Sequence, residues 1–393
     1  MSERLAQRAL CLDDFEAMSR RRLPRPVFGY VAGATERNAS LRDNEAAFAE
    51  WAFQPRVLVD VSRRSPAATL FGRAWSAPFG IAPMGMSALA AYRGDIVLAE
   101  AARAAEIPMI LSGSSLIRME EVIAANPDAW FQAYLPGDAK RVEALVDRVA
   151  AAGFGTLLLT VDTAVLPNRE NNVRNGFSTP LRPSLRLLWE GITHPRWSIG
   201  SFLRTWAKFG MPHFENSFAE RGAPILARNV LRDFTARDHL NWEHLALIRR
   251  RWPGVLMIKG VMHPEDARRA AAEGCEGVIV SNHGGRQLDG TASPLRVLPA
   301  IRAAAPGIAV LYDGGVRRGT DVLKALALGA DFVFVGRPML HAAAAAGRAG
   351  VDRAIALLKG EIERNMAQLG VNSLAALRPD CLLRVGGYSS TTT

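Results

Sequence analysis

Short apolar runs recur along the 393-residue chain at nearly regular intervals, and this recurrence limits the possible folds more than any other feature. Each run is only a few residues long and ends in glycine or polar residues, as buried parallel strands do. Most segments between the runs are rich in Ala, Arg and Glu at helical spacing, for example residues 95–105 and 139–152. The runs centre near Ala82, Met109, Gln132, Leu159, Met257, Ile279, Val310 and Phe334.

Strand followed by helix about every 25 residues, eight times over, predicts a TIM (β/α)8 barrel. A doubly wound sheet is the alternative, but no G-x-G-x-x-G motif follows the first run and the eight units are alike. We expect a single domain over residues 1–393, with an N-terminal helical segment and a barrel over roughly residues 75–365. One interval is far longer than the others, which places a long insertion after the fourth strand, over roughly residues 178–245.

The cysteines and the absence of targeting segments indicate the cellular compartment of the protein. Cys11, Cys275 and Cys381 are far apart and have no Cys or His beside them, so the sequence predicts neither a disulfide framework nor a metal site. No signal peptide and no membrane-spanning run is recognisable. We therefore expect a cytoplasmic protein.

Catalytic residues of such barrels lie at the C-terminal ends of the strands, so the residues after each run are the candidates. The richest end is SNHGGRQLDG (281–290), where His283 can exchange protons near neutral pH and Arg286 is a fixed cation. A surface turn with a structural His is the alternative interpretation, but so many polar residues at one strand end favour a site. The other ends supply Pro83, Met84, Gly85, Ser112, Gln132, Tyr134, Thr160, Asp162, Lys259, Ser281, Asp313, Gly314, Gly315, Gly336 and Arg337.

The last two strand ends indicate a phosphate site. Loops after strands 7 and 8 of these barrels commonly bind phosphate through backbone N–H groups and a helix N-terminus. The segment from Asp313 to Arg317 and the pair Gly336-Arg337 offer the glycines and cations that this requires. Together with Lys259 and the amide of Gln132, they predict a phosphorylated aromatic cofactor.

Six motifs, taken together, resemble the FMN-dependent L-2-hydroxy-acid dehydrogenase/oxidase family, whose members include (S)-mandelate dehydrogenase, L-lactate dehydrogenase and glycolate oxidase. The motifs are SNHGGRQLDG, DGGVRRGTDVLKALALGAD, IAPMG, WFQAY, LTVDT and IKG, and the resemblance extends from about residue 12 to residue 383. It implies an enzyme that oxidises a 2-hydroxy acid to the 2-keto acid with FMN as cofactor. It also implies a homo-oligomer, for which a tetramer is the expected form.

The resemblance also implies catalytic roles. His283 would remove a proton from the substrate, and Asp162 would orient the imidazole and stabilise its cationic form. Arg286 and Arg169 would bind the substrate carboxylate, because a guanidinium matches its two oxygens.

Further roles follow from the same resemblance. Tyr30 and Tyr134 would hydrogen-bond the substrate, and Lys259 would stabilise the reduced flavin. The residues implied to contact FMN are Pro83, Met84, Gly85, Ser112, Gln132, Thr160, Lys259, Ser281, Asp313, Gly314, Gly315, Arg317, Gly336 and Arg337.

Two positions differ from the glycolate-oxidase pattern. Gly85 stands where that subgroup has alanine, and Ser114 stands where it has a tryptophan facing the substrate side chain. The smaller Ser114 predicts room for a larger substrate, unless a loop shift refills the space.

The insertion is basic and aromatic. Residues 181–251 carry twelve Lys and Arg against six Asp and Glu, a net +6 of the chain's +10. Cations mixed with aromatic side chains suit contact with anionic lipid, here the inner face of the cell membrane, with Trp197, Trp206 and Phe202 as the expected apolar contacts. A soluble lid over the barrel is the alternative. The segment interleaves Trp189, Trp197, Phe202, Trp206, Phe209 and Phe214 with Arg186, Arg196, Arg204 and Lys208.

The sequence thus favours a flavin dehydrogenase that passes electrons to a membrane quinone. A soluble oxidase that reduces dioxygen is the alternative among enzymes, and a catalytically silent flavoprotein that serves as a binding module is the alternative of another class. Nucleic-acid binding is not expected, because the basic charge comes with no nucleic-acid motif.

Overall fold

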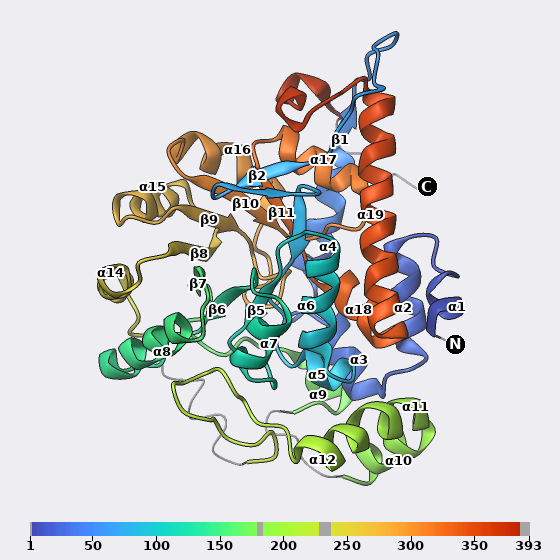
Figure 1. Ribbon diagram of the computed structural model, residues 1–393, viewed down its shortest axis with the longest axis vertical. Helices are drawn as coiled ribbons and strands as arrows, with labels where there is room; N and C mark the ends of the chain where they lie inside the picture. Colours follow the sequence, from blue (N-terminus) through green and yellow to red (C-terminus); the bar gives the residue numbers. More distant parts are fainter. Residues whose placement is uncertain (1, 179–183, 228–236, 386–393) are drawn as a thin grey trace.

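A computed structural model describes residues 2–178, 184–227 and 237–385. Its main sheet has eight parallel strands in the order β4-β11-β10-β9-β8-β7-β6-β5, and a parallel bridge between Ile81 and Met109 joins the two outer strands. The sheet therefore closes on itself, which confirms the predicted TIM barrel (Figure 1). The strands are β4 (Phe79–Ile81), β5 (Ile110–Ser112), β6 (Trp130–Ala133), β7 (Thr156–Thr160), β8 (Val255–Val261), β9 (Gly277–Val280), β10 (Ala309–Asp313) and β11 (Phe332–Val335).

Apolar side chains from alternate strand positions fill the inside of the barrel. A hairpin of β2 (Ala68–Leu70) and β3 (Arg73–Trp75) packs Leu70 and Trp75 against them and covers one end. Because side chains one apart point to opposite faces of a sheet, the remaining strand residues pack outward against the helices. The inner layer contains Ile110, Trp130, Leu158, Met257, Ile279, Leu311 and Phe334.

The outer helices each bury one apolar stripe. In α8 (Ala139–Ala151) the Asp138 side chain caps the first turn by accepting from the amide of Lys140, and Val142, Leu145, Val146 and Val149 are buried at helical spacing. The other helices around the barrel are α5 (Ser87–Ala90), α6 (Gly94–Ala104), α7 (Met119–Ala125), α14 (Trp242–Arg251), α15 (Pro264–Ala272), α16 (Pro294–Ala304), α17 (Gly319–Ala327), α18 (Arg337–Ala346) and α19 (Arg348–Leu369).

The N-terminal helical segment begins on the outer helices α18 and α19, and its later part is tied to the loop after β9. The Asp289 carboxylate accepts hydrogen bonds from the backbone N–H groups of Arg37 (3.0 Å) and Ser40 (2.9 Å). Asn44 and Asn282 exchange two amide hydrogen bonds of 2.8 and 2.7 Å. The segment comprises α1 (Ser2–Ala6), α2 (Leu12–Arg20), α3 (Arg25–Ala32), α4 (Ala39–Ala46) and η1 (Ala47–Glu50).

The C-terminal strand of the described chain pairs with the strand that follows the N-terminal helical segment. Strand β1 (Trp51–Phe53) pairs antiparallel with β12 (Leu382–Arg384), which follows the short helices η3 (Leu374–Ala376) and η4 (Pro379–Cys381). None of the helices within residues 2–178, 184–227 and 237–385 is long and apolar enough to cross a bilayer.

The connection between β7 and β8 holds the insertion. Its helices α10, α11 and α12 gather at the end of the molecule opposite β1 and β2 (Figure 1). Residues 179–183 and 228–236 of the predicted insertion lie outside the described residues. The described elements are α9 (Glu170–Asn175), α10 (Leu185–Thr193), α11 (Pro195–Trp197), the π-helical turn η2 (Ser198–Leu203) and α12 (Arg204–Phe209).

The expected lipid contact by Trp197 is wrong. This side chain is only 8% exposed, and its indole N–H donates to the carbonyl oxygen of Leu89 at 2.6 Å. It also stacks on the half-buried Phe202, with ring centroids 5.6 Å apart. Trp197 and Phe202 therefore anchor the insertion to the barrel.

Candidate active site

A polar layer lies directly above the apolar interior of the barrel. Each member follows an interior residue of its strand by two positions. Because successive side chains of a strand point to opposite faces, residues two apart point to the same face, here the inside of the barrel. This arrangement explains why the predicted site residues converge although they are distant in sequence. The layer contains Ser112, Gln132, Thr160, Lys259, Ser281, Asp313 and Gly336.

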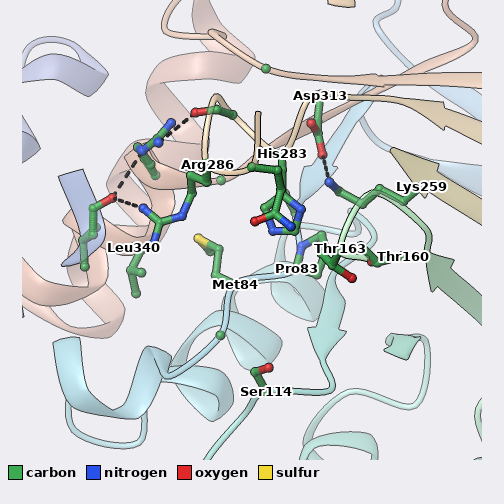
Figure 2. Close-up of a pocket in the computed structure, with 18 of the residues that line it drawn as sticks. Pro83, Met84, Ser114, Thr160, Thr163, Lys259, His283, Arg286, Asp313 and Leu340 are labelled. Carbon is green, nitrogen blue, oxygen red and sulfur yellow. Dashed lines mark hydrogen bonds and ion pairs between the residues drawn. The ribbon is translucent and has the colours of Figure 1, made fainter. Parts of the chain in front are cut away.

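Lys259 and Asp313 form the most buried ion pair of this layer. The Lys259 Nζ lies 3.1 Å from Asp313 Oδ2 (Figure 2). It also donates to Ser281 Oγ at 2.8 Å, and Ser281 Oγ donates to Asp313 Oδ1 at 2.5 Å. Burial by itself would lower the pKa of Lys259, but the carboxylates of Asp313 and Asp162 outweigh burial and raise it. Lys259 is thus a permanent cation in the floor of the site.

Gln132 has a donor that the protein does not use. Its Oε1 accepts from Ser112 Oγ at 3.0 Å, and its buried Nε2 has no acceptor among the described residues. Buried polar groups nearly always have partners, so a donor left over at this place indicates a ligand with an acceptor atom.

His283 lies at the centre of the strand ends, paired with a carboxylate. Its Nδ1 is 3.0 Å from Asp162 Oδ1 and 3.2 Å from Oδ2, and its backbone N–H donates to Ser281 Oγ at 3.0 Å. Asp162 can approach because Gly260 has φ +104° and no side chain; a Cβ there would lie 2.7 Å from the Asp162 Cβ. The left-handed φ of +58° at His283 turns the loop back over the barrel.

The protonation states of this pair follow from burial and charge. Burial lowers the pKa of His283 below its ordinary value, more than the Asp162 carboxylate raises it. For Asp162, burial by itself would raise the pKa, but the charges of His283 and Lys259 lower it. At neutral pH the pair is therefore a neutral imidazole beside a carboxylate, which is the form that accepts a proton.

Two arginines face the cavity beside His283 and are held by backbone carbonyls. Arg286 Nη1 donates to the carbonyl oxygens of Tyr30 (2.8 Å) and Gly33 (2.6 Å). Arg169 Nε donates to the carbonyl oxygen of Arg286 at 3.2 Å, and its Nη2 donates to Gln287 Oε1 at 3.0 Å. Burial lowers the pKa of Arg286 to about 10, so it remains a cation at neutral pH.

Gln287 was not singled out by the sequence analysis, although it belongs to the SNHGGRQLDG motif. Its Nε2 donates to the backbone carbonyl oxygen of Asp162 at 3.0 Å while its Oε1 accepts from Arg169. It therefore links the His283–Asp162 pair to the arginines.

The loops after β10 and β11 form the opposite part of the site. Arg337 donates to the carbonyl oxygens of Val31 (3.2 Å) and Gly284 (2.9 Å), and burial lowers its pKa to about 9. Gly315 has φ +75°, and a Cβ on it would lie 2.0 Å from the carbonyl oxygen of Asn44, so only glycine fits. Arg317 pairs with Glu45 at 2.7 Å.

One cavity of about 280 Å³ connects these groups. In Figure 2, His283 lies between Arg286 and the Lys259–Asp313 pair, with Met84 facing the same space. The predicted residues that line the cavity are Tyr30, Pro83, Met84, Gly85, Tyr134, Thr160, Arg169, Lys259, His283, Arg286, Asp313, Gly314, Gly315, Arg317, Gly336 and Arg337. The predicted residues Ser112, Gln132, Asp162 and Ser281 are not among the residues that line the cavity, and three of them, Ser112, Gln132 and Ser281, are buried at the adjoining strand ends.

The cavity also has lining residues that the sequence analysis did not predict. Apolar or uncharged members come from the β7–β8 connection, and Arg237 comes from the same connection. Sequence patterns gave no signal for most of them, because they belong to irregular segments; Thr163 is the exception, since it ends the LTVDT motif. Those of the β7–β8 connection include Thr163, Val165, Leu166, Phe214 and Arg237, and Gln287 lies in the loop after β9.

Two tyrosines and a small residue define another side of the cavity. The Tyr30 hydroxyl donates to the carbonyl oxygen of Gly85 at 3.4 Å. A Cβ on Gly85 would lie 3.0 Å from the Ser114 Cβ, so glycine and serine are packed closely here. Ser114 lines the cavity, and burial raises the pKa of Tyr134, which keeps its phenol protonated.

Comparison with known proteins identifies the class. The model of the FMN-dependent dehydrogenase family matches residues 19–384, and the chain belongs to this family. It is 39% identical to the (S)-mandelate dehydrogenase of Pseudomonas putida, over 97% of this chain and 96% of that protein. It is also 39% identical to an L-lactate dehydrogenase of Xanthomonas euvesicatoria pv. vesicatoria (strain 85-10), over 95% of this chain and 96% of that protein.

Solved structures of mandelate-oxidising enzymes are also similar to this chain. A crystal structure of the monotopic membrane protein (S)-mandelate dehydrogenase superposes with a TM-score of 0.88 at 39% identity, covering 96% of this chain and 100% of that one. A mandelate oxidase superposes with a TM-score of 0.80 at 34% identity, covering 95% and 98%.

The protein is therefore an FMN-dependent 2-hydroxy-acid dehydrogenase, and FMN is its cofactor. The residues of the site fit FMN: the unused Gln132 donor suits a ring carbonyl, and the Gly315 and Arg337 end suits an anionic phosphate.

Proposed function

We propose that the protein oxidises an L-2-hydroxy acid, of the mandelate or lactate kind, to the 2-keto acid and passes the electrons to a membrane quinone. The observation that carries the chemistry is the neutral His283, held by Asp162 between Lys259 and Arg286 in one cavity. Relatives named as mandelate and lactate dehydrogenases support the substrate class.

His283 acts as the base. Because its Nδ1 is engaged by Asp162, its Nε2 is the nitrogen that can take a proton from the substrate. The cation that results lies beside the Asp162 carboxylate, which stabilises it. FMN, when bound, supplies a two-electron acceptor, and Lys259 keeps a positive charge in its site.

Arg286 and Arg169 orient the substrate by its carboxylate. Each arginine is fixed by the hydrogen bonds already described, so little conformational entropy is lost when a carboxylate binds. Tyr30 and Tyr134 line the same cavity and donate to the carboxylate and the α-oxygen. These contacts would fix the position of the substrate's α-carbon in the cavity.

FMN would be held at the other end of the cavity. Its flavin would meet side-chain polar atoms of Ser112, Gln132, Thr160 and Ser281 at the strand ends. Its phosphate would be bound by backbone N–H groups of the loops after β10 and β11, together with Arg317 and Arg337. The remaining contacts come from Pro83, Met84, Gly85, Asp313, Gly314, Gly315 and Gly336.

The membrane part of the proposal rests on a face of the insertion. Leu185, Leu188, Trp189 and Ile192 recur at helical spacing along α10, yet all four are between 61 and 87% exposed. An apolar stripe that faces solvent needs a cover, and basic neighbours favour an anionic bilayer. We define the docking face as Leu185, Leu188, Trp189, Ile192, Ile199, Leu203, Trp206 and Phe209, flanked by Arg186, Arg196, Arg204 and Lys208.

Two experiments test the proposal. Anaerobic reduction of the flavin is followed with glycolate, L-lactate, long-chain 2-hydroxy acids and both mandelate enantiomers; reduction by an L-acid supports the chemistry, and no reduction by any acid contradicts it. Co-sedimentation with anionic liposomes and quinone reduction in vesicles test the acceptor. If the protein stays in the supernatant at low salt and reduces dioxygen rapidly, it is a soluble oxidase.

A further inference from the structure

A second cavity, of about 490 Å³, lies between the insertion and the helices of the barrel. The insertion lines it with residues of α12 and of the loop that follows, and the barrel lines it with residues of α5, α7 and α8. Its volume is that of an ordinary small-molecule site, and it shares no lining residue with the cavity that contains His283. The chemistry described so far does not use it.

The two cavities are back to back. Phe214 lines the first cavity and Glu215 lines the second, so the Cα atoms of these neighbours are about 3.8 Å apart. Ser114 lines the first cavity and Leu116 lines the second, and two residues of chain separate their Cα atoms by about 7.6 Å at most. The wall between the cavities is therefore one chain segment thick at these points.

Hydrogen bonds join the two segments that form this wall. The backbone N–H of Glu215 donates to the carbonyl oxygen of Ser115 at 3.1 Å. Asn216 Nδ2 donates to the carbonyl oxygen of Ile117 at 2.8 Å, and its Oδ1 accepts from the backbone N–H of Met119 at 2.9 Å. These bonds fix the thickness of the wall, so a ligand in the second cavity would lie at a set separation from the active site.

The second cavity also adjoins the docking face. Phe209 belongs to the docking face, is 50% exposed and lines this cavity. Thr205, one turn earlier on α12, lines it as well. A molecule held in the cavity can therefore extend past α12 toward the bilayer on which the docking face rests in the proposed function.

The lining of the second cavity combines apolar surface with paired charges. Its apolar members include Ala88, Leu116, Ile117, Phe209 and Met211. Its arginines each have a carboxylate partner, so the lining favours a neutral ligand with acceptor oxygens over an anionic one, which the carboxylates would repel. The pairs are Arg93–Glu121 (2.8 Å), Arg118–Glu120 (3.4 Å), Arg148–Glu120 (2.9 Å) and Arg221–Glu215 (2.9 Å).

We propose that the second cavity binds the quinone that accepts the electrons, with the quinone ring beside the shared wall and the isoprenoid tail running past α12 into the bilayer. This inference rests on the proposed function, in which a membrane quinone is the acceptor. A quinone is neutral, its carbonyl oxygens accept hydrogen bonds, and its ring and tail are apolar, so it matches the lining. Substrate and quinone then occupy separate cavities on the two sides of one wall.

The overall reaction balances in electrons and protons. The 2-hydroxy acid loses two electrons and two protons, and the quinone gains two of each to become the quinol. The electrons pass through FMN and across the wall. The protons are exchanged with water: His283 accepts one in the active site, and the exposed Arg118 and Arg221 leave the second cavity open to solvent.

The first test measures binding without turnover. Calorimetry gives the dissociation constant of decylubiquinone for the oxidised, FMN-loaded protein, alone and with saturating benzoylformate or pyruvate, the keto acids of mandelate and lactate. Separate cavities predict the same dissociation constant in both conditions. Competition between the keto acid and the quinone would place the quinone in the active-site cavity and overturn the inference.

The second test fills the cavity. Ala219 lines it from a half-buried loop position, and Ala219→Trp should weaken decylubiquinone binding about 10- to 100-fold, because the new ring occupies the space. Reoxidation of the reduced flavin by decylubiquinone should slow, whereas flavin reduction by the hydroxy acid and reoxidation by ferricyanide should keep wild-type rates. Ala272→Trp, at an exposed position of α15, is the matched control. Wild-type quinone affinity in a folded Ala219→Trp protein overturns the inference.

Photolabelling of the wild type needs no variant to fold. A photoreactive azido derivative of decylubiquinone should label residues 116–121 or 205–221, and unlabelled decylubiquinone should protect them. Label confined to α10, or label that decylubiquinone does not reduce, overturns the inference. Protection by dihexanoyl phosphatidylglycerol but not by decylubiquinone would make the cavity a phospholipid site instead.

The proposed oxidation and this inference can fail separately. If no 2-hydroxy acid reduces the flavin and the quinone still labels the second cavity, only the proposed oxidation fails. If mandelate or lactate reduces the flavin and decylubiquinone reoxidises it from another site, only the assignment of the second cavity fails.

Discussion

The strand-end site and the docking face depart from ordinary residue placement in opposite ways. At the site, charged groups such as Lys259 and Asp313 are buried, whereas on α10 apolar groups such as Leu188 and Trp189 are exposed. Soluble proteins usually bury apolar side chains and expose charges. Each departure costs stability, and in the proposed function a partner relieves each one: anions for the cations of the site and lipid for the exposed apolar stripe.

The two regions also differ in how they are fixed. The site residues are held by strands and by hydrogen bonds from several elements, so their geometry exists before a ligand arrives. The docking face is attached through a few contacts, among them Trp197 to Leu89 and Arg204 over the Tyr92 ring at 3.9 Å. The difference teaches that chemistry and membrane contact should be separable by mutation.

The largest expected effect tests the site alone. His283→Ala should slow flavin reduction by about 10²- to 10⁴-fold, the usual contribution of a general base. Stopped-flow absorbance under anaerobic conditions measures it, and FMN content and liposome binding should stay at wild-type levels. Reduction at the wild-type rate in the FMN-loaded variant would remove His283 from its assigned role.

The next effect tests the docking face alone. Replacing both Trp189 and Ile192 by Glu should weaken binding to anionic liposomes about 100-fold, because two apolar side chains lose their burial and two negative charges are added. Thr193→Glu, an exposed position on the same helix, adds charge without removing apolar area and should have a much smaller effect. A slower flavin reduction in the double variant would show that the two regions are coupled after all.

A third prediction tests whether the carboxylate end and the phosphate end of the site are separate. Arg286→Lys should weaken substrate binding about 10- to 100-fold, since an ammonium cannot form the two parallel bonds of a guanidinium. Arg337→Ala should instead weaken FMN binding, measured by ultrafiltration of the released cofactor. Equal loss of FMN in both variants would contradict the separation into carboxylate and phosphate ends.

A smaller change is expected in the pH dependence of kcat/KM. The pKa of His283 lies below the ordinary 6.5, so the base is neutral at pH 7 and is protonated only as the pH falls through that lower value. The ratio kcat/KM should therefore be level near neutrality and fall about tenfold per pH unit in acid. Because Asp162 raises the pKa of His283, Asp162→Asn should move the acid limb to lower pH. A limb above pH 6.5 in the wild type would be inconsistent with this base.

The smallest effect concerns single charges beside the docking face. Arg186→Gln should weaken liposome binding about fivefold at low salt, the value of roughly 1 kcal/mol for one basic residue near an anionic surface. The difference should vanish at high salt, where the Debye length is short. A salt-independent loss would point to a structural role for Arg186.

The sequence predicted the barrel and the convergence of the strand-end residues because side chains alternate between the two faces of each strand. Alternation along buried strands puts Thr160 and Lys259 on the same face as Leu158 and Met257, and closure of the sheet then brings the strand ends together. The sequence could not predict the inward direction of Trp197, which depends on a carbonyl 108 residues away. Nor could it predict that Arg237 lies in the cavity, because irregular segments have no period.

The hydrogen bonds between the N-terminal segment and the loop after β9 have a consequence for synthesis of the protein. Arg286 relies on the carbonyl oxygens of Tyr30 and Gly33, which leave the ribosome more than 250 residues earlier. A growing chain that ends before β9 contains Tyr30 but neither His283 nor Arg286, so it lacks both the base and the guanidinium that the Tyr30 and Gly33 carbonyl oxygens hold. The flavin site is therefore complete only when nearly all of the chain has emerged, because Arg337 follows later still.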